Sequence, residues 1–422
     1  MNFITDPSPH LNDLAGFVQD SPSSFHAAEK VARRLEDAGA LRVDESLPYP
    51  SEPGAYVVVR DGAVAAWVVP ENPAGAFRIV GSHTDSPGFR LKPNPQDSSV
   101  GYVRAQVEVY GGVLLNAWLD REIEFAGRVV DGNGKGRLVR TGPVGRIPQL
   151  AIHLDRAVSS EGLKLDKQRH TAPLLGRAGD VRDSFGADAV AWDLISADTQ
   201  PPREFGLNGE FFASGRLDNL MSVHASLVAF EGLLHDAHLD SIPLLIANDH
   251  EEVGSATATG AAGPMLEEIL DRIGIALGHD ADQRHRALGE SICVSADGAH
   301  AVHPNYPGEH DPGHHPHLNV GPVVKINANQ RYATDAVGQA LWTRWTRQAA
   351  EKTGQDIEVQ TFVSANHKPC GSTIGPITAT RLGIRTIDVG APMLSMHSAR
   401  EMTGSLDPWM LRAVLTEFWS AS

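Results

Sequence analysis

The stretch Asp249-His250-Glu251-Glu252-Val253-Gly254 follows, after Asn248, the apolar run Ile242-Pro243-Leu244-Leu245-Ile246-Ala247. An apolar run of this length is typical of a buried strand, and here it ends in four consecutive ionisable side chains. Charged groups at the edge of a core are paired or bound to a metal ion, because an unpaired buried charge is too costly. The adjacent carboxylates of Glu251 and Glu252 therefore suggest two roles, one as a ligand of a cation and one in moving a proton.

The composition indicates a soluble globular protein. The chain has 422 residues, of which 41% are hydrophobic and 21% are charged, and it is long enough for two domains. No apolar run reaches the length of a membrane span, and Met1–His10 lacks the pattern of a secretory signal. The two cysteines, Cys293 and Cys370, provide no disulfide framework. We therefore expect a cytoplasmic protein with no membrane partner.

The charge balance limits the kinds of partner. A net charge of −16 argues against nucleic acid, whose phosphates bind basic surfaces. An acidic small substrate remains compatible with this charge, because a few basic residues can dominate inside a pocket. Histidine is frequent, with 19 residues, and several of them lie between His303 and His317. Such a run is more often a solvated surface loop than a binding site.

The first part of the chain has an α/β pattern. A helix is expected over Phe25–Ala38, with Ser24 as its N-terminal cap. Two strand patterns, Ala55–Val59 and Ala63–Val69, are joined through Asp61-Gly62, which is a strong hairpin signal.

The next strand pattern ends in residues that suit a binding site. Phe77–Gly81 has the composition of a buried strand and leads into Ser82-His83-Thr84-Asp85-Ser86-Pro87. Open α/β sheets bind ligands at the carboxyl ends of their strands, and His83 is expected at such an end.

The middle of the chain changes to a β-rich pattern. The segments Val103–Tyr110, Glu122–Val130 and Arg137–Arg140 alternate like antiparallel strands. The α/β pattern resumes at Gly215. We therefore predict an α/β fold in which residues 1–90 and 206–422 form one discontinuous domain and residues 91–205 form an inserted β-rich domain.

Five candidate metal ligands share one structural position. Two imidazoles and three carboxylates suit a pair of divalent ions such as Zn²⁺ or Mn²⁺, with one carboxylate as a bridge. Asp218, which lies between the others in the sequence, is our candidate for that bridge. Each candidate is expected at the end of a strand or at a strand-to-helix turn: His83, Asp218, Glu252, Asp297 and His397.

Two further carboxylates are the candidate catalytic residues. Asp85 lies two residues after His83 and can accept the second ring N–H of that histidine, which would fix its tautomer. Glu251 is left without a metal ion to bind. It is placed to act as the general base that takes a proton from a bridging water and passes it to the leaving amine.

Each candidate also has an ordinary structural explanation. A lone histidine such as His83 is more often a hydrogen-bonded side chain than a ligand, an aspartate before a helix is usually an N-cap, and adjacent glutamates usually mark a solvated surface. The motif lacks the second histidine of the His-Glu-x-x-His zinc site. The segment Gly371-Ser372-Thr373-Ile374-Gly375 lacks the spacing of a serine nucleophile and suits a backbone cradle for a substrate carbonyl. The coincidence of five such residues at element ends favours the metal site.

Six motifs occur in order between Phe25 and Met402, nearly the whole chain. They are Ser82-His83-Thr84-Asp85-Ser86-Pro87, Arg216-Leu217-Asp218-Asn219, Asp249-His250-Glu251-Glu252-Val253-Gly254-Ser255, Lys325-Ile326-Asn327-Ala328-Asn329-Gln330-Arg331-Tyr332, Pro369-Cys370-Gly371 and Ser395-Met396-His397-Ser398. Together they resemble the M18 family of metallo-aminopeptidases, the aspartyl aminopeptidase type. The resemblance implies a di-zinc exopeptidase core with an inserted β-rich dimerisation domain. It also implies a homo-oligomer, a tetrahedral dodecamer of dimers whose active sites face an interior chamber.

The resemblance further implies which residues hold the two metal ions of each subunit. His83 and Asp297 would hold one ion, and Glu252 and His397 the other. Asp218 would bridge the two. We expect Zn²⁺, with Mn²⁺ or Co²⁺ as alternatives.

The remaining site residues follow from the same resemblance. Glu251 would be the base. His153 matches a family histidine that reaches a neighbouring subunit's site; it is also described as a metal ligand, but we favour substrate contact because five ligands already complete a two-metal site. Lys325 would pair with an acidic side chain or a carboxylate of the substrate. Gly371 and Ser372 are the further substrate-binding candidates.

The sequence therefore predicts a two-metal aminopeptidase that removes an N-terminal residue, preferably Asp or Glu, from peptides. One alternative is an aminopeptidase that prefers neutral or apolar residues. Another is a related two-metal carboxypeptidase or N-acyl amino-acid deacylase. The non-enzymatic alternative is an assembly scaffold braced by metal ions, against which an unengaged Glu251 would argue, since a structural site has no use for a free base.

Overall fold

The molecule is built around a nine-stranded mixed sheet with the strand order β1-β2-β3-β14-β4-β15-β19-β17-β18. The computed structural model describes residues 7–73, 75–235 and 239–420, so the first six residues of Met1–His10 lie outside it. The strands of this sheet are β1 (Leu41–Arg42), β2 (Gly54–Arg60), β3 (Ala63–Val69), β4 (Phe77–His83), β14 (Ile242–Asn248), β15 (Ile292–Ala296), β17 (Val323–Ile326), β18 (Gln360–Val363) and β19 (Arg385–Gly390).

Four adjacent strands at the centre of the sheet, β14, β4, β15 and β19, run parallel to one another. Their carboxyl ends therefore lie along one edge. The register of β14 on β4 places Asn248 opposite His83. The acidic motif that follows β14 thus begins beside the end of β4, and sequence segments far apart in the chain converge there.

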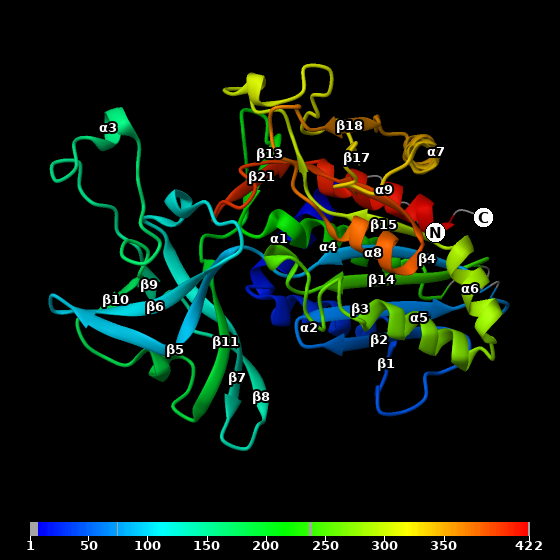
Figure 1. Cartoon of the computed structure of the whole chain (residues 1–422), viewed down its shortest axis with the longest axis horizontal. Coiled ribbons are helices and arrows are strands. Elements are labelled where there is room, and N and C mark those ends of the chain that lie inside the picture. The colour runs from blue at the N-terminus through cyan, green and yellow to red at the C-terminus, as the bar shows by residue number, and fades with distance from the viewer. Residues whose placement is uncertain (1–6, 74, 236–238, 421–422) are drawn as a thin grey trace.

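Helices cover both faces of this sheet (Figure 1). Side chains of β14 alternate between the two layers, with Leu245 and Ala247 in one core and Leu244 and Ile246 in the other. The first core is closed by α1 (Ser8–Asp20), α2 (Ser24–Asp37), α4 (Leu217–Glu231), α7 (Ala336–Thr353) and α9 (Asp407–Ser420). The opposite face carries α5 (Met265–Ala276), α6 (Ala281–Glu290) and α8 (Ile374–Leu382).

A second, antiparallel sheet of seven strands lies to one side of the first (Figure 1). It has its own core, which includes Phe89, Trp118, Phe125 and Leu194. An arm of residues 147–173, here called the α3 arm, projects from it and carries α3 (Val158–Glu161). The strands are β5 (Gly88–Ser99), β6 (Tyr102–Tyr110), β7 (Glu122–Asp131), β8 (Gly136–Arg140), β9 (Gly145–Arg146), β10 (Leu174–Gly176) and β11 (Ala189–Asp198), with the 3₁₀ turns η1 (Leu115–Trp118) and η2 (Val181–Ser184).

A small third sheet joins segments from three parts of the chain. Its strand order is β12-β13-β21-β20-β16. The strands are β12 (Arg203–Phe205), β13 (Phe211–Ser214), β16 (Ala299–His300), β20 (Pro392–Leu394) and β21 (Glu401–Gly404); the turns η3 (Glu251–Val253) and η4 (Pro307–Glu309) complete the elements. This sheet pairs β13, which leads into α4, with β21, so the candidate ligands Asp218 in α4 and His397 after β20 lie near it.

The α/β fold class predicted from the sequence is confirmed, and so is the hairpin through Asp61-Gly62. The predicted cap Ser24 is wrong: Ser23 has the extended backbone of an N-cap, and its hydroxyl accepts the N–H of His26. The seven-stranded sheet runs from residue 88 to 198, whereas β12 pairs outside it. The division into a domain of 1–90 plus 206–422 and one of 91–205 stays a prediction. Among the described residues, no helix is long and apolar enough to cross a membrane.

Candidate metal centre

The candidate ligands come from the ends of the central strands. His83 is the last residue of β4, and Asp297 follows β15. Glu252 lies in η3, the turn that follows β14 after Asp249 and His250. The parallel arrangement of these three strands brings an imidazole and two carboxylates to one edge of the sheet.

Asp218 and His397 reach the same place from other elements. Asp218 lies at the start of α4, but its backbone is non-helical (φ −81°, ψ 102°), so it is no ordinary first-turn residue. His397 follows β20. Both side chains face the residues at the strand ends, as the distances below show.

The structure brings the five predicted ligands into two groups that share Asp218. One group contains His83, Asp218 and Asp297, and the other contains Asp218, Glu252 and His397. The two oxygens of Asp218 point to different histidines: Oδ1 lies 3.4 Å from Nε2 of His83, and Oδ2 lies 3.4 Å from Nε2 of His397. In addition, Nε2 of His83 is 3.6 Å from Oδ1 of Asp297, and Nε2 of His397 is 3.3 Å from Oε2 of Glu252.

The donor set fits divalent cations. Within the described part of the chain, Oδ1 of Asp218 and Oε1 of Glu252 are buried oxygens with no hydrogen-bond partner. Buried carboxylate oxygens without a partner are costly unless a cation satisfies them. Two imidazoles with three carboxylates, one of them shared, are ligands that Zn²⁺ accepts. The residues present are therefore suited to a pair of such ions.

The charges of the site shift its pKa values strongly. Burial lowers the pKa of His83, but the neighbouring carboxylates of Asp218 and Asp297 outweigh this effect and raise it well above the usual value. Burial also lowers the pKa of His397, but the carboxylate of Asp218 outweighs this effect and raises the pKa to about 9. Burial raises the pKa of Asp218, but the two histidines dominate and lower it. This direction favours the ionised form of Asp218, which is the form of a carboxylate that binds a cation.

Glu251 stands next to both groups without belonging to either. It forms a third possible group with His83 and Glu252. Burial, together with the carboxylates of Asp297 and Asp218, raises the pKa of Glu251 to about 7. Divalent cations bound nearby would lower this value, because they stabilise the ionised form.

Asp85 contacts both His83 and the η3 segment. The Nδ1 atom of His83 lies 3.1 Å from the backbone carbonyl of Asp85 and 3.4 Å from its carboxylate Oδ1. The carboxylate itself accepts the backbone N–H groups of Glu251 and Glu252, both at 3.1 Å, and the hydroxyl of Tyr110 at 2.7 Å. Asp85 therefore orients the η3 segment as well as the histidine.

Several supporting residues were not predicted. Glu401 accepts the backbone N–H groups of Asp218 and His397, and the carbonyl of Gly112 accepts Nδ1–H of His397 in the tautomer that leaves Nε2 free. Tyr110 binds Asp85 as described above. No local pattern marks these residues, because their roles depend on contacts between segments that lie far apart in the sequence; an acidic residue in a strand, as at Glu401, is the one weak signal.

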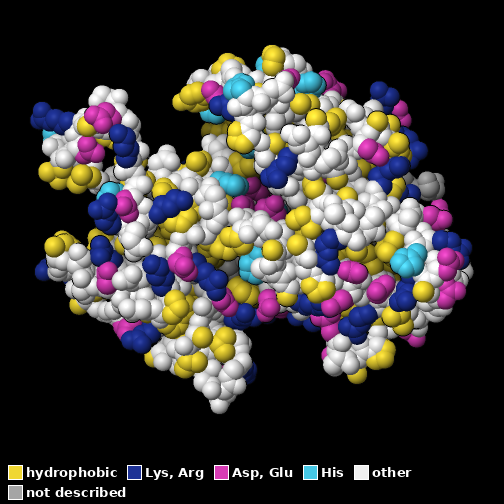
Figure 2. Space-filling model, viewed as in Figure 1, with side chains coloured by type: hydrophobic (Ala, Val, Ile, Leu, Met, Phe, Trp, Pro, Cys, Tyr) yellow, Lys and Arg dark blue, Asp and Glu magenta, His cyan; other side chains and the backbone are white. Residues whose placement is uncertain are grey.

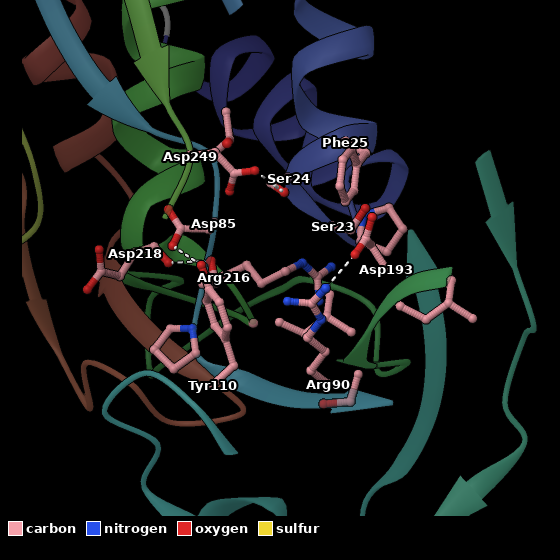
Figure 3. A pocket seen from close by; sticks show the side chains of 18 of the residues that line it. Ser23, Ser24, Phe25, Asp85, Arg90, Tyr110, Asp193, Arg216, Asp218 and Asp249 are labelled. Carbon is pink, nitrogen blue, oxygen red and sulfur yellow. Dashed lines mark hydrogen bonds and ion pairs between the residues drawn. The ribbon is translucent and has the colours of Figure 1, made fainter. Parts of the chain in front are cut away.

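A cavity of about 170 Å³ is lined by Asp85 and Asp218, among other residues. Asp85, Asp218 and Tyr110 lie together on one side of it, and Arg90 and Asp193 of the second sheet lie opposite (Figure 3). On the face shown in Figure 2, acidic side chains gather in a hollow near the centre. The metal centre therefore lies where the large sheet meets the seven-stranded sheet.

Lys325 has protein partners in this structure. It is 2% exposed, its Nζ donates to the carbonyl of Gly298 at 2.9 Å, and it lies 3.7 Å from Oδ2 of Asp297. The ammonium therefore supports the candidate ligand Asp297. Two N–H groups of Lys325 are left over from the bond to Gly298, so contact with a substrate carboxylate stays a prediction.

The other predicted substrate residues lie outside the two ligand groups. His153 is exposed in a turn of the α3 arm, between the exposed Leu150 and Leu154. Gly371 and Ser372 are exposed just before the N-terminus of α8, whose cap is Thr373. Backbone N–H groups at such a terminus are suited to a carbonyl or a carboxylate, but their contact with substrate stays a prediction.

The sequence profile described as "Aminopeptidase I zinc metalloprotease (M18)" matches residues 17–185 and 184–419. The chain belongs to the M18 family of zinc metallo-aminopeptidases. Membership makes it a metallopeptidase hydrolase. The M18 profile spans the strand ends and all five candidate ligands.

Curated M18 relatives are similar over nearly their whole length. The chain is 48% identical to "Probable M18 family aminopeptidase 2" of Streptomyces avermitilis, with 97% of each chain covered. It is 43% identical to the protein of the same name from Pseudomonas entomophila, with 96% of this chain and 97% of the relative covered.

Solved M18 structures share the fold. A chain in the cryo-EM structure described as "the Ape4 and Nbr1 complex" is 34% identical, with a TM-score of 0.91 over 99% of this chain and 86% of that one. The "S. cerevesiae mApe1 dodecamer" is 28% identical, with a TM-score of 0.84 over 97% and 96%. The M18 aminopeptidase of Thermotoga maritima has a TM-score of 0.87 at 22% identity, which shows the common fold, with 100% and 98% covered.

Proposed function

We propose that this M18 chain is a two-metal aminopeptidase that removes an N-terminal residue, acidic by preference, from peptides. One observation carries the proposal: two three-residue ligand groups share Asp218, and Glu251 lies beside both. A purely structural metal site would be closed by its ligands and would have no use for an adjacent carboxylate.

The five candidate ligands take definite places in this proposal. His83 and Asp297 would hold one ion, Glu252 and His397 would hold the other, and Asp218 would contact both. When bound, a pair of zinc ions supplies Lewis-acid polarisation of the scissile carbonyl and activation of water.

Glu251 moves the proton. Its carboxylate accepts a proton from the attacking water and delivers it to the nitrogen of the leaving amine, so that one group serves as base and then as acid. Asp85 holds the backbone N–H groups of Glu251 and Glu252 at 3.1 Å, which fixes the base relative to the ligand beside it. Adjacent glutamates thus perform separate tasks on one short turn.

Basic and polar groups around the centre support binding of the substrate. We assign Lys325 to the acidic side chain or a carboxylate of the substrate, and Gly371 and Ser372 to its carbonyl groups. The contacts of Lys325 with Gly298 and Asp297 favour a second candidate, an aminopeptidase that prefers neutral residues, because they engage part of the ammonium.

Assembly forms part of the proposal. We propose a homo-oligomer, dimers joined into a tetrahedral dodecamer, in which residues 91–205 mediate dimerisation and His153 enters a neighbouring subunit's site. The exposed position of His153 on the α3 arm supports this arrangement, as does the similar chain described as a dodecamer. We place the assembly in the cytoplasm.

A panel of aminoacyl substrates tests the proposal. Metal-depleted and zinc-restored protein are compared on substrates with acidic, neutral and basic N-terminal residues, each with a free and with an acetylated α-amine. We expect hydrolysis only with zinc, fastest for Asp and Glu, and none after acetylation. Cleavage of the acetylated substrates would instead indicate a deacylase, and metal binding without hydrolysis would indicate a scaffold.

A further inference from the structure

We propose that Glu401 is a positioning residue that joins the two sides of the metal centre through the backbone. The inference rests on the proposed two-metal site, but it concerns how the protein aligns its ligands. Glu401 is the first residue of β21 in the small third sheet. It makes no contribution to the two ligand groups themselves.

The geometry of its carboxylate carries the inference. Oε2 of Glu401 accepts the backbone N–H of Asp218 at 2.9 Å, and Oε1 accepts the backbone N–H of His397 at 2.7 Å. One side chain thus binds the backbone of both Asp218, the proposed bridging ligand, and His397, a proposed ligand of one ion. Both oxygens point to donors whose own side chains enter the site.

The two segments that Glu401 joins are irregular. Asp218 has non-helical backbone angles at the start of α4, and His397 has a positive φ of 67°. The positive φ of His397 is uncommon for a residue other than glycine and persists when surrounding contacts hold it. The hydroxyl of Ser86 also holds the carbonyl of Asp218 at 2.7 Å, and the carbonyl of Gly112 holds the ring of His397, but neither touches both segments.

Glu401 is a buried carboxylate, so its two hydrogen bonds are needed to offset the cost of its burial. Its side chain is only 2% exposed, and its carboxylate lies in a region crowded with other carboxylates. A buried acidic group there is unfavourable unless its hydrogen bonds compensate. Replacement by glutamine keeps the shape but turns one acceptor into an NH₂ donor, which then faces an N–H group.

Asp407, which lies just beyond the other end of β21, provides a matched control. Asp407, the first residue of α9, is 0% exposed and accepts the backbone N–H groups of Asn319 at 2.9 Å and Gly404 at 3.0 Å. It performs the same kind of backbone bridging but joins no candidate ligand. Asp407→Asn therefore reproduces the loss of a buried carboxylate without touching the metal centre.

The experiment is a zinc titration of metal-depleted protein in competition with a chromophoric chelator, with Co²⁺ absorption spectra as a second readout. We expect Glu401→Gln to weaken binding of zinc by about 10–100-fold, as is usual when a partner of a metal ligand is removed, and to shift the Co²⁺ bands. Asp407→Asn should bind both ions like the unmodified protein. Equal affinities and spectra for Glu401→Gln and the unmodified protein would overturn the proposal, as would equal weakening by both variants.

A second variant and the behaviour of the unmodified protein distinguish the remaining outcomes. If Glu401→Gln does not fold, the same titration on Glu401→Asp, which keeps the charge but shortens the reach, replaces it with the same two outcomes. Binding of two ions by the unmodified protein without peptide hydrolysis would contradict the proposed function while leaving the role of Glu401 intact. Failure of the unmodified protein to bind two ions would overturn both the inference about Glu401 and the proposed two-metal site.

Discussion

The hydroxyl of Tyr110 donates a hydrogen bond of 2.7 Å to Oδ2 of Asp85. Tyr110 is the last residue of β6 in the seven-stranded sheet, whereas Asp85 follows β4 of the large sheet. The same carboxylate holds the backbone N–H groups of Glu251 and Glu252. Tyr110 of the second sheet therefore binds Asp85, the residue that holds the backbone of the proposed base Glu251.

Replacing Tyr110 by phenylalanine should lower kcat by about 10-fold, which is the lower range for removing a partner of a metal-site residue. Asp85 loses one of its donors and holds η3 less firmly. Steady-state kinetics with zinc-saturated protein measures the effect. The control is Tyr306→Phe, because Tyr306 is 61% exposed; equal kinetics for the two variants would show that the bond between Tyr110 and Asp85 has no role in turnover.

Replacing Lys325 by methionine tests the preference for acidic residues. The aliphatic chain of methionine retains the packing, but the positive charge beside Asp297 is lost. We expect kcat/KM to fall about 10–100-fold more for Asp and Glu substrates than for Leu substrates, as for a lost hydrogen bond between charged groups. The exposed Lys167→Met is the control. A uniform fall for all substrates would instead assign Lys325 to the support of Asp297 alone.

Because the pKa of the half-buried His26 is lowered, we expect the free energy of unfolding to decrease in acid. Burial, with the positive charges of Arg140 and Arg216, lowers the pKa of His26 to about 4 from 6.5. The carboxylate of Glu124 acts in the opposite direction. Because the unfolded chain binds this proton more tightly, the contribution of His26 to the free energy of unfolding is fully present above pH 6.5 and is lost as the pH falls towards 4.

Urea unfolding at several pH values checks this prediction. The loss due to His26 should amount to ~1–3 kcal/mol between neutral pH and pH 4. His26→Gln should show a correspondingly shallower dependence of stability on pH, whatever its stability at pH 7. The exposed His285→Gln should retain the full dependence, and identical slopes for the two variants would contradict the prediction.

Mixing two inactive variants tests whether subunits share a site. His153→Ala lacks the residue proposed to enter the neighbouring site, and Glu251→Gln lacks the base. If His153 acts across subunits, mixed oligomers contain some sites with both residues intact, so activity should return to a measurable fraction of the unmodified level. Each variant dissociated and reassembled alone is the control. Mixed oligomers, verified by mass spectrometry, that stay inactive would assign His153 to its own subunit.

The convergence of the candidate ligands could be predicted in part, because it depends on short-range patterns. His83, Glu252 and Asp297 each follow an apolar run, and parallel strands necessarily gather such ends at one edge. Asp218 was open to an N-cap explanation; its non-helical backbone and the distances from its two oxygens to His83 and His397 reveal a different arrangement.

The supporting contacts could not be predicted for a physical reason. Tyr110 and Glu401 act on residues that lie far away in the sequence, and only the packing of the three sheets brings them together. The cap of α2 moved by one residue because Ser23 and Ser24 are both good caps, and only the extended backbone of Ser23 decides between them. Helices α1, α5, α6 and α9 received no prediction from the sequence pattern and are found only in the structure.

The central claim is that Glu251 is the base beside a complete two-metal site. The most direct measurement is the turnover of Glu251→Gln at a zinc content verified as two ions per subunit. Glutamine cannot accept the proton, so we expect turnover to fall by at least 100-fold, within the range for general-base catalysis, with the zinc content unchanged. Turnover at the unmodified rate with both ions bound would contradict the account.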